Sequence, residues 1–97
     1  MDVVINHENY YQIISFRDRA WEDYLHWQKI DKAKFKRINQ LIKDIQLDPF
    51  IGIGKPEPLR HDLAGLWSRR IDGEHRLVYK IDGKNIIIVQ CRYHYDD

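Results

Sequence analysis

Two Asp-Gly pairs, at positions 72–73 and 82–83, constrain the fold of this chain more than any other feature. Asp-Gly between runs of β-branched and aromatic residues is a strong signal for a tight hairpin turn. The runs around these pairs predict three strands, over residues 67–71, 75–80 and 85–95. We therefore expect the C-terminal half to be an antiparallel meander.

The N-terminal half shows helical periodicity after a short apolar run over 13–16, which predicts one strand. A helix over 18–29 is expected to bury the face that carries Trp21, Tyr24, Leu25 and Gln28. Asp31 is a typical N-cap for a second helix, which Asp48-Pro49 ends. Its apolar face consists of Phe35, Ile38, Leu41, Ile42 and Ile45. The short connection predicts an antiparallel helix hairpin and an α+β fold.

Size and composition limit the chain to one small domain. Its 97 residues carry a net charge of only +1, and 43% of them are hydrophobic. The longest uncharged apolar run, Ile86–Val89, is far too short to span a membrane, and no basic leader precedes an apolar stretch. The single cysteine, Cys91, excludes an internal disulfide and fits a cytoplasmic protein.

The length of the 82–83 turn decides which side chains share a face of the sheet. A two-residue turn at Asp82-Gly83 mixes charged and apolar side chains on both faces, whereas a three-residue loop over 81–83 separates them. The second register, with a similar loop over 71–73, predicts an apolar face of Leu77, Tyr79, Ile87, Val89 and Cys91. It sets Ser68 opposite Arg76 and predicts a solvent-open face of Ser68, Arg70, Arg76, Arg92 and His94. Arg69 falls on the apolar face and is expected to reach out at an edge.

A loop rich in Gly and Pro, over 52–66, borders this cationic face and carries Lys55, Glu57 and Arg60. Such a set suits RNA cleavage without a metal ion or cofactor. Glu57 could take the 2′-hydroxyl proton, Arg76 could stabilise the phosphorane, and His94 could protonate the leaving oxygen. Tyr93 and Tyr95 flank His94 and could stack on an unpaired base.

Each of these features also has a purely structural interpretation. A glutamate in a Pro-rich loop is usually solvated surface, and arginines along a strand often form only the wet face of a sheet. The five histidines show no zinc-type spacing, and the chain has no Walker loop, nucleophile elbow or Rossmann glycine pattern. The patterns alone therefore do not separate an enzyme from a binding module.

Several longer runs are similar to one known family. WEDYLHWQ, INQLIKDI, GKPEPLRHDLAGLWSRRI, EHRLVY and CRYHY resemble the Txe/YoeB branch of the RelE-like bacterial toxins, in order, over residues 13–95. The resemblance implies a microbial-ribonuclease-like domain with a four-stranded sheet, in a homodimer that cleaves mRNA in the ribosomal A site. It also implies a YefM-type antitoxin as partner, and contact with operator DNA only through the complex with that antitoxin.

By the same resemblance, the general base falls on Glu57, the transition-state arginine on Arg76 and the general acid on His94. Residues near the substrate fall on Lys55, Arg60, Arg70 and Tyr95. Residues 1–12 then form an extension to a single domain over 13–97, and Asp96-Asp97 follow the usual terminal tyrosine. The alternative is a catalytically inactive module of this fold that binds antitoxin and acts in operator repression.

Overall fold

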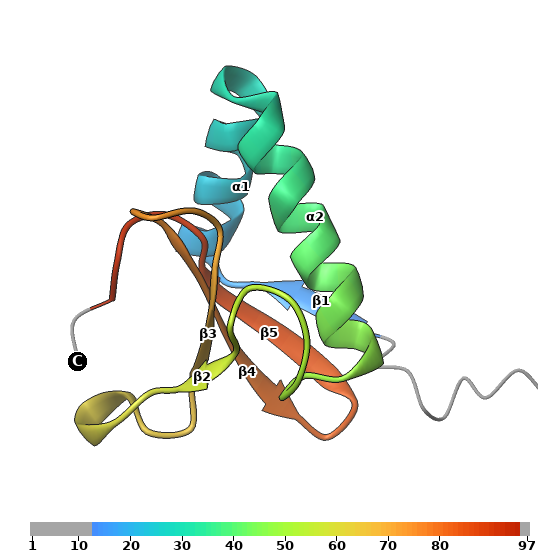
Figure 1. The fold of residues 1–97 in the computed structure, drawn as a ribbon, viewed down its shortest axis with the longest axis vertical. Helices are drawn as coiled ribbons and strands as arrows, with labels where there is room; N and C mark the ends of the chain where they lie inside the picture. Colours follow the sequence, from blue (N-terminus) through green and yellow to red (C-terminus); the bar gives the residue numbers. More distant parts are fainter. Residues whose placement is uncertain (1–12, 96–97) are drawn as a thin grey trace, which may run out of the picture.

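The computed structural model describes residues 13–95, so the proposed extension over 1–12 lies outside the described residues. The elements in chain order are β1 (Ile13–Phe16), α1 (Asp18–Ile30), α2 (Lys32–Leu47), β2 (Glu57–Pro58), a 3-10 helix (His61–Leu63), β3 (Trp67–Arg70), β4 (Arg76–Asp82) and β5 (Asn85–Gln90). The expected α+β class, with a strand, a helix hairpin and a meander, is confirmed (Figure 1).

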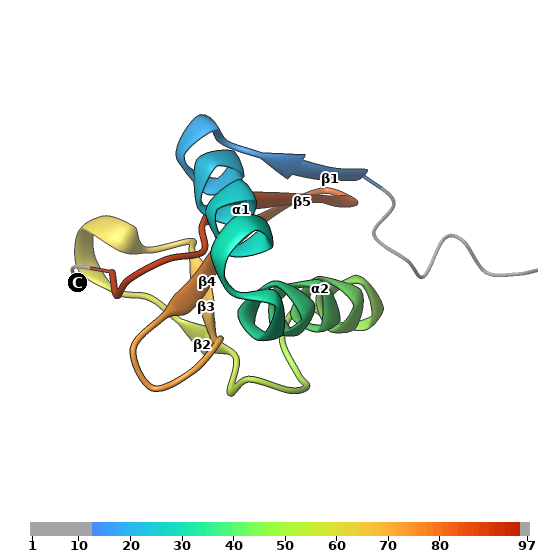
Figure 2. The ribbon, with the colours of Figure 1, turned by 90° about the horizontal axis from the view of Figure 1, so that it is seen from above.

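The sheet has five strands in the order β1-β5-β4-β3-β2, which corrects the expected four. The additional strand, β2, has two residues, too few to show an alternating pattern in the sequence. β1 lies parallel to β5, and the other neighbours are antiparallel. Figures 1 and 2 show both helices on one face of this strongly twisted sheet.

The second helix follows its sequence pattern and the first does not. Asp31 caps α2 by accepting from the amides of Ala33 and Lys34, and the predicted apolar face of α2 packs into the core. On α1 the buried residues are Ala20, Asp23 and Trp27, whereas Trp21 is 47% exposed. Of the predicted face only Tyr24 packs against the core, because the helix is turned so that a polar residue, Asp23, is buried where it accepts a hydrogen bond from the amide of Cys91.

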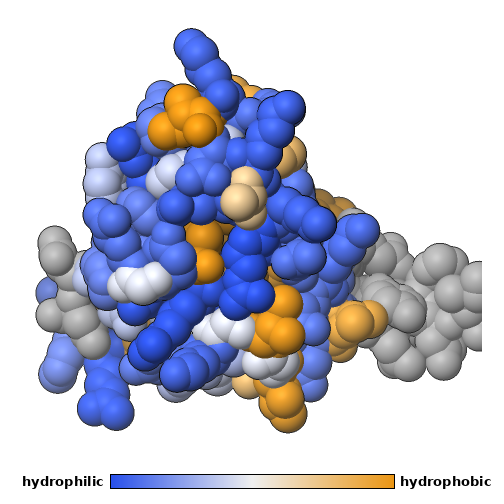
Figure 3. All heavy atoms as spheres, turned by 45° about the horizontal axis from the view of Figure 1, so that its top comes forward, coloured by the Kyte–Doolittle hydropathy of each residue, from blue (hydrophilic) through white to orange (hydrophobic). Residues whose placement is uncertain are grey.

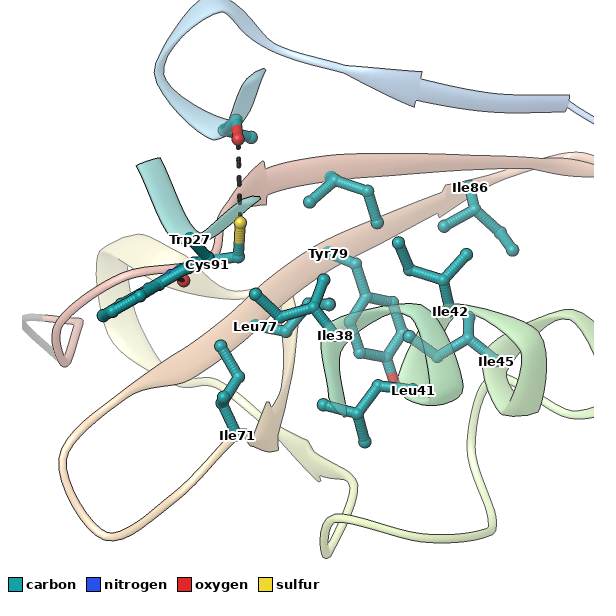
Figure 4. Close-up of a cluster of buried hydrophobic side chains, with 12 residues drawn as sticks. Trp27, Ile38, Leu41, Ile42, Ile45, Ile71, Leu77, Tyr79, Ile86 and Cys91 are labelled. Atoms are coloured by element: carbon teal, nitrogen blue, oxygen red, sulfur yellow. Dashed lines mark hydrogen bonds between the residues drawn. The ribbon is translucent and has the colours of Figure 1, made fainter. Parts of the chain in front are cut away.

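The core lies between α2 and the sheet (Figure 4). Its largest fully buried apolar side chains include Ile38, Leu41 and Ile45 from α2 and Leu77, Tyr79, Ile86 and Ile88 from β4 and β5. Burying each such side chain stabilises the fold by about 1.5–3 kcal/mol. Cys91 closes the core beneath α1, where its thiol lies 3.6 Å from the carbonyl oxygen of Ala20.

The β4–β5 hairpin has a register that neither turn considered from the sequence predicts. Asp82 pairs with Asn85 across a two-residue turn of Gly83 and Lys84. Gly83 has a φ of +61°, the left-handed conformation that such turns require at their first position. Ile86 and Ile88 therefore face the core, instead of the predicted Ile87 and Val89.

A β-bulge then changes the face that each later residue of β5 occupies. Ile88 pairs with Tyr79, but Gln90 pairs with Val78, so Val89 is an extra residue on β5. Gln90 is thereby turned to the face opposite the helices, and Cys91 to the core. The core position of Cys91 is confirmed for this reason, although the register that predicted it was wrong. The strand ends at Gln90, not at the predicted residue 95.

The predicted pairing of Ser68 with Arg76 is also wrong, because β3 pairs Ser68 with Val78 and Arg70 with Arg76. The shift is an even number of residues, so the prediction that these three polar side chains share a face is confirmed. That face is only partly open to solvent, since Ser68, Arg76, Val78 and Gln90 are buried whereas Arg70 is exposed.

Most of the surface in Figure 3 is hydrophilic, and the apolar side chains visible there form separate small patches. Within residues 13–95, no helix combines the length and the apolar character needed to cross a membrane.

Candidate active site

A row of paired residues crosses the sheet on the face opposite the helices. Glu57 on β2 pairs with Ser68 on β3, Ser68 with Val78 on β4, and Val78 with Gln90 on β5. Paired residues of antiparallel strands point to the same side, so the register places Glu57 at the exposed end of this row. The pair of Arg70 and Arg76 follows on the same face.

Arg76 is 9% exposed and its guanidinium is anchored to the turn before β4. Nη1 donates to the carbonyl oxygens of Asp72 at 2.8 Å and His75 at 3.1 Å. Within residues 13–95 the hydrogen bonds of this guanidinium use Nη1 alone. The remaining N–H groups can meet an anion that approaches from the sheet face, while the charge itself is held in place.

The segment before β2 is anchored by Arg69, whose side chain is fully buried on the core face. The prediction that Arg69 reaches out at an edge is therefore wrong. Its Nη1 pairs with the carboxylate of Asp44 on α2, and its Nε donates to the hydroxyl of Tyr79 at 3.2 Å. Burial raises the pKa of the Asp44 carboxyl, but hydrogen bonds from the Ile53 amide and Arg69 bring it below its ordinary value.

The other donors of Arg69 hold the backbone of the loop that leads from α2 to β2. They bind three loop carbonyl oxygens, those of Asp48, Ile51 and Ile53. Tyr79 donates its hydroxyl proton to a fourth carbonyl, that of Pro49. One buried guanidinium thus satisfies all its donors and orders the whole segment, which we call the anchored loop (residues 48–54).

The end of the anchored loop lies too close to its neighbours for a side chain. A Cβ on Gly52 would lie 1.9 Å from Oδ2 of Asp44, and one on Gly54 would lie 2.8 Å from Cδ2 of Leu41. The carbonyl of Gly54 also accepts the amide of Arg70 at 2.7 Å. The two glycines therefore allow the loop backbone to pack closely against α2 and β3. Strand β2 then begins at Glu57, two residues after Lys55.

Lys55 and Arg60 are both exposed and lie on either side of β2. Lys55 has a φ of +52° directly after Gly54, whereas Arg60 precedes the 3-10 helix in the loop over 59–66. Figures 1 and 2 agree that this loop and the chain after β5 project on the same side of the molecule. Lys55 precedes Glu57 by two residues, and Arg60 follows it by three.

The chain after β5, residues 91–95, is here called the C-terminal segment. Its first residue is held by α1: the amide of Cys91 donates to Asp23, and its carbonyl accepts from Nε1 of Trp27 at 2.8 Å. Burial raises the pKa of the Cys91 thiol to about 12, so this cysteine is not a nucleophile at neutral pH.

Tyr93 is held on both sides of its backbone. Its amide donates to Nδ1 of His75 at 2.7 Å, and its carbonyl accepts from the amide of Arg76 at 3.1 Å. Tyr93 has a φ of +65°, an uncommon conformation for a residue with a side chain. The surrounding hydrogen bonds maintain that conformation immediately before His94.

Gln90 joins the C-terminal segment to the paired row. Its side-chain amide donates to the carbonyl oxygens of Arg92 and His94, each at 3.1 Å. The rings of His94 and Tyr95 lie 6.5 Å apart, and the side chain of His94 is exposed. The structure thus brings the backbone of His94 to the face that carries Glu57, Arg70 and Arg76.

Arg92 does not join that cationic face. Its guanidinium lies over the ring of Tyr93 at 4.6 Å and near that of Trp27 at 5.9 Å. Its Nε is buried without a hydrogen bond among the residues that the structure describes. The expectation that Arg92 projects with Arg70 and Arg76 is corrected, because the chain leaves the strand at Gln90.

Sequence reasoning missed the residues that hold the C-terminal segment, namely Asp23, Trp27, His75 and Gln90. One signal was available for Gln90, a polar residue at the end of the apolar run IIIV. Separately, no group of three or more His, Cys, Asp or Glu side chains within the described part of the chain could hold a metal ion.

Comparisons with known proteins agree with this fold and these motifs. The family model for the YoeB-like toxin of bacterial type II toxin-antitoxin systems matches residues 16–95. The toxin YoeB of Streptomyces coelicolor is 60% identical over 82 residues, which are 84% of this chain and 98% of that protein.

Two solved structures from Staphylococcus aureus are also similar. The YoeB dimer has a TM-score of 0.81 at 49% identity, covering 86% of this chain and 97% of that one. The heterotetrameric complex of the YoeB-YefM toxin-antitoxin has a TM-score of 0.81 at 48% identity, covering 87% and 99%. With a family match over nearly all the described residues, this chain belongs to the YoeB-like toxins of bacterial type II toxin-antitoxin systems.

Proposed function

We propose that this toxin is a ribosome-dependent endoribonuclease that cleaves translated mRNA in the ribosomal A site without a metal ion. The observation that carries the proposal is the register across β2, β3 and β4. It places an exposed carboxylate, Glu57, on the same face as Arg70 and Arg76. Gln90 adds the backbone of His94 to that face.

The proposed reaction is a transesterification within the RNA. Glu57 takes the proton of the 2′-hydroxyl, whose oxygen forms a bond to the adjacent phosphorus. Arg76 stabilises the charge that develops on the phosphorane. His94 gives a proton to the 5′ oxygen as the bond between phosphorus and that oxygen breaks. The products are a 2′,3′-cyclic phosphate and a 5′-hydroxyl end.

The remaining basic and aromatic residues are proposed to hold the message. Lys55 and Arg70 would bind phosphate groups beside the reacting one, and Arg60 would bind farther along the strand. The exposed ring of Tyr93 and the half-buried ring of Tyr95 would stack on bases, a common way to hold single-stranded RNA. Arg92 would contribute to RNA binding indirectly, by holding the ring of Tyr93, which its guanidinium covers.

We also propose a partner and a setting. A YefM-type antitoxin is the expected partner, because the Staphylococcus aureus relative forms a complex with YefM. A homodimer is expected by the same reasoning, since a YoeB dimer has been solved from that organism. The toxin would act in the cytoplasm on ribosomes, and would meet operator DNA only through the antitoxin complex.

One observation favours a second function, a catalytically inactive module that binds antitoxin and takes part in operator repression. Nη1 of Arg76 binds two carbonyl oxygens of its own turn, which is a structural role for this arginine. In that case Arg76 would stabilise the 72–76 turn and would not act on RNA.

The test uses purified protein and ribosomes programmed with a defined mRNA, with 5′ ends mapped by primer extension. We expect one cut in the A-site codon, and a loss of roughly 10²- to 10⁴-fold in single-turnover rate for His94→Ala. His26 is a half-buried residue of α1 outside the proposed site, and His26→Ala serves as a control that should cut at the wild-type rate. Intact message with wild-type protein, despite ribosome binding measured by cosedimentation, would favour the inactive module.

A further inference from the structure

The C-terminal segment carries the proposed acid but has no regular secondary structure to position it. Residues 91–95 follow β5 with bends only at Arg92 and Tyr93, and His94 itself is exposed. A general acid has to lie within hydrogen-bond reach of its target oxygen. The groups that hold the backbone around His94 therefore decide whether His94 can act.

Two buried side chains hold that backbone from opposite sides. Nδ1 of His75 accepts the amide of Tyr93 at 2.7 Å, and Nε2 of Gln90 donates to the carbonyls of Arg92 and His94 at 3.1 Å. His75 is 6% exposed and Gln90 is 8% exposed. Their hydrogen bonds to the segment involve only main-chain atoms, and the ring of His75 also lies 5.8 Å from that of Tyr93.

The directions of these hydrogen bonds define which chemistry each position needs. An Nδ1 that accepts an amide proton carries no proton of its own, so the hydrogen bond from Tyr93 needs an acceptor at this position of His75. Gln90 needs an N–H donor, because both of its partners are carbonyl oxygens. A glutamate of nearly the same shape would place a carboxylate oxygen against those two carbonyls.

Two further observations indicate that the arrangement is specific. Tyr93 adopts a left-handed φ of +65° between the His75 contact and His94. The β-bulge at Val89 is what turns Gln90 to this face at all, since an unbroken register would place it on the core face. Bulges often re-aim a side chain next to a functional site.

We infer that His75 and Gln90 are positioning residues that together clasp the backbone of the C-terminal segment and so place the proposed acid His94 for proton transfer. The inference rests on the proposed endoribonuclease function. It assigns roles to two residues that never touch the RNA. We call the hydrogen bonds of His75 and Gln90 to the backbone of residues 92–94 the clasp. The clasp forms in the folded toxin itself, so it can be measured without any substrate.

The experiment compares Gln90→Met, which keeps the shape without donors, with Gln90→Glu, which reverses the polarity. The exposed Gln40→Met is the matched control. Amide hydrogen exchange of Tyr93 and His94, measured by NMR on the full chain, reports the clasp. Single-turnover cleavage on programmed ribosomes, as a function of toxin concentration, separates the rate at saturation from the half-saturating concentration.

We expect exchange of these amides to rise at least tenfold in Gln90→Met and further in Gln90→Glu, with Gln40→Met like wild type. The cleavage rate at saturation should fall at least tenfold, while the half-saturating concentration changes less than threefold. His75→Leu should behave like Gln90→Met, and His75→Asn should recover much of both readouts because its Oδ1 can replace Nδ1 as the acceptor.

Unchanged exchange in Gln90→Met and His75→Leu would overturn the clasp. Faster exchange with an unchanged rate at saturation would overturn its role in placing His94, and a slower rate with unchanged exchange would mean that Gln90 acts on RNA directly. If exchange responds as expected but wild-type protein cleaves no message, the clasp stands and the proposed endoribonuclease function fails.

Discussion

The anchored loop and the C-terminal segment each carry a proposed catalytic residue to the same face, but they are held in different ways. The anchored loop, which leads to Glu57, depends on one charged side chain, Arg69, that binds three loop carbonyls and Asp44. The C-terminal segment, which carries His94, is held by several side chains that each make one or two hydrogen bonds.

This difference determines how much stability each half of the site loses when one of its anchoring side chains is removed. A buried guanidinium is strongly destabilising when its partners are removed, because the remaining charge or carbonyls lose their compensation. Separate hydrogen bonds contribute about 0.5–1.5 kcal/mol each, and the loss of one leaves the others in place. We therefore expect one substitution, at Arg69, to remove most of the stability of the anchored loop. The C-terminal segment should instead lose stability in smaller increments, one for each hydrogen bond removed.

The largest effect should come from Arg69→Met, which removes the charge but keeps much of the side-chain length. It leaves three loop carbonyls and the Asp44 carboxylate without their donor, so the free energy of unfolding should fall by about 3–5 kcal/mol. Arg69→Lys, which keeps the charge with fewer donors, should lose less. Urea unfolding followed by circular dichroism measures both.

Arg70→Met is the matched control for stability, since Arg70 is the next residue of β3 and is exposed. Its free energy of unfolding should stay within about 0.5 kcal/mol of wild type. If Arg69→Met and Arg70→Met lowered the free energy of unfolding by similar amounts, Arg69 would be no more important for stability than an exposed arginine.

A smaller effect is expected from Asp23→Leu, which takes one contact from the C-terminal segment. The buried amide of Cys91 would lose its acceptor, at a cost of about 1–3 kcal/mol in the free energy of unfolding. Glu22→Leu, at the exposed neighbouring position of α1, should change it by less than about 0.5 kcal/mol. A cost for Asp23→Leu as large as that for Arg69→Met would contradict the stepwise behaviour of this segment.

The smallest effect is a pH dependence of the anchored loop. Burial raises the pKa of Asp44, but the Ile53 amide and Arg69 lower it to below the ordinary value. The ionised carboxylate therefore stabilises the fold at pH values above about 4, and this contribution is lost as the pH falls through the lowered pKa. Urea unfolding between pH 6 and pH 2 should show a shallower decline for Asp44→Asn than for wild type. Parallel declines would show that this carboxyl is not linked to folding.

Much of the fold could be predicted from the sequence, because its determinants are local. Asp31 and the apolar spacing of α2 depend on neighbours within one or two helical turns. Ser68 and Arg70 share a face because of the two-residue period of a strand, and Arg76 joins them because the register of β3 with β4 differs from the predicted one by an even number of residues. The family motifs added the likeness to toxins, which the comparisons confirm.

The parts that could not be predicted depend on contacts between distant segments. Asp23 is buried because a residue far along the chain, Cys91, brings an amide to it. Arg69 lies in the core because Asp44 and the loop carbonyls surround it, which no local pattern shows. The bulge at Val89 has no signature of its own in the sequence. The roles of Glu57, Arg76 and His94 stay predictions until cleavage is measured.

The bulge at Val89 also sets a rule for insertions and deletions in this chain. Because Val89 is the extra residue, removing it would make β5 regular with Ile88 still opposite Tyr79 and Gln90 still opposite Val78, so Gln90 and Cys91 would keep their faces. An added residue would instead need a second bulge, or it would exchange interior and exterior for the residues that follow it. A designer could therefore shorten β5 by this one residue, but could not lengthen it by one without inverting the end of the strand.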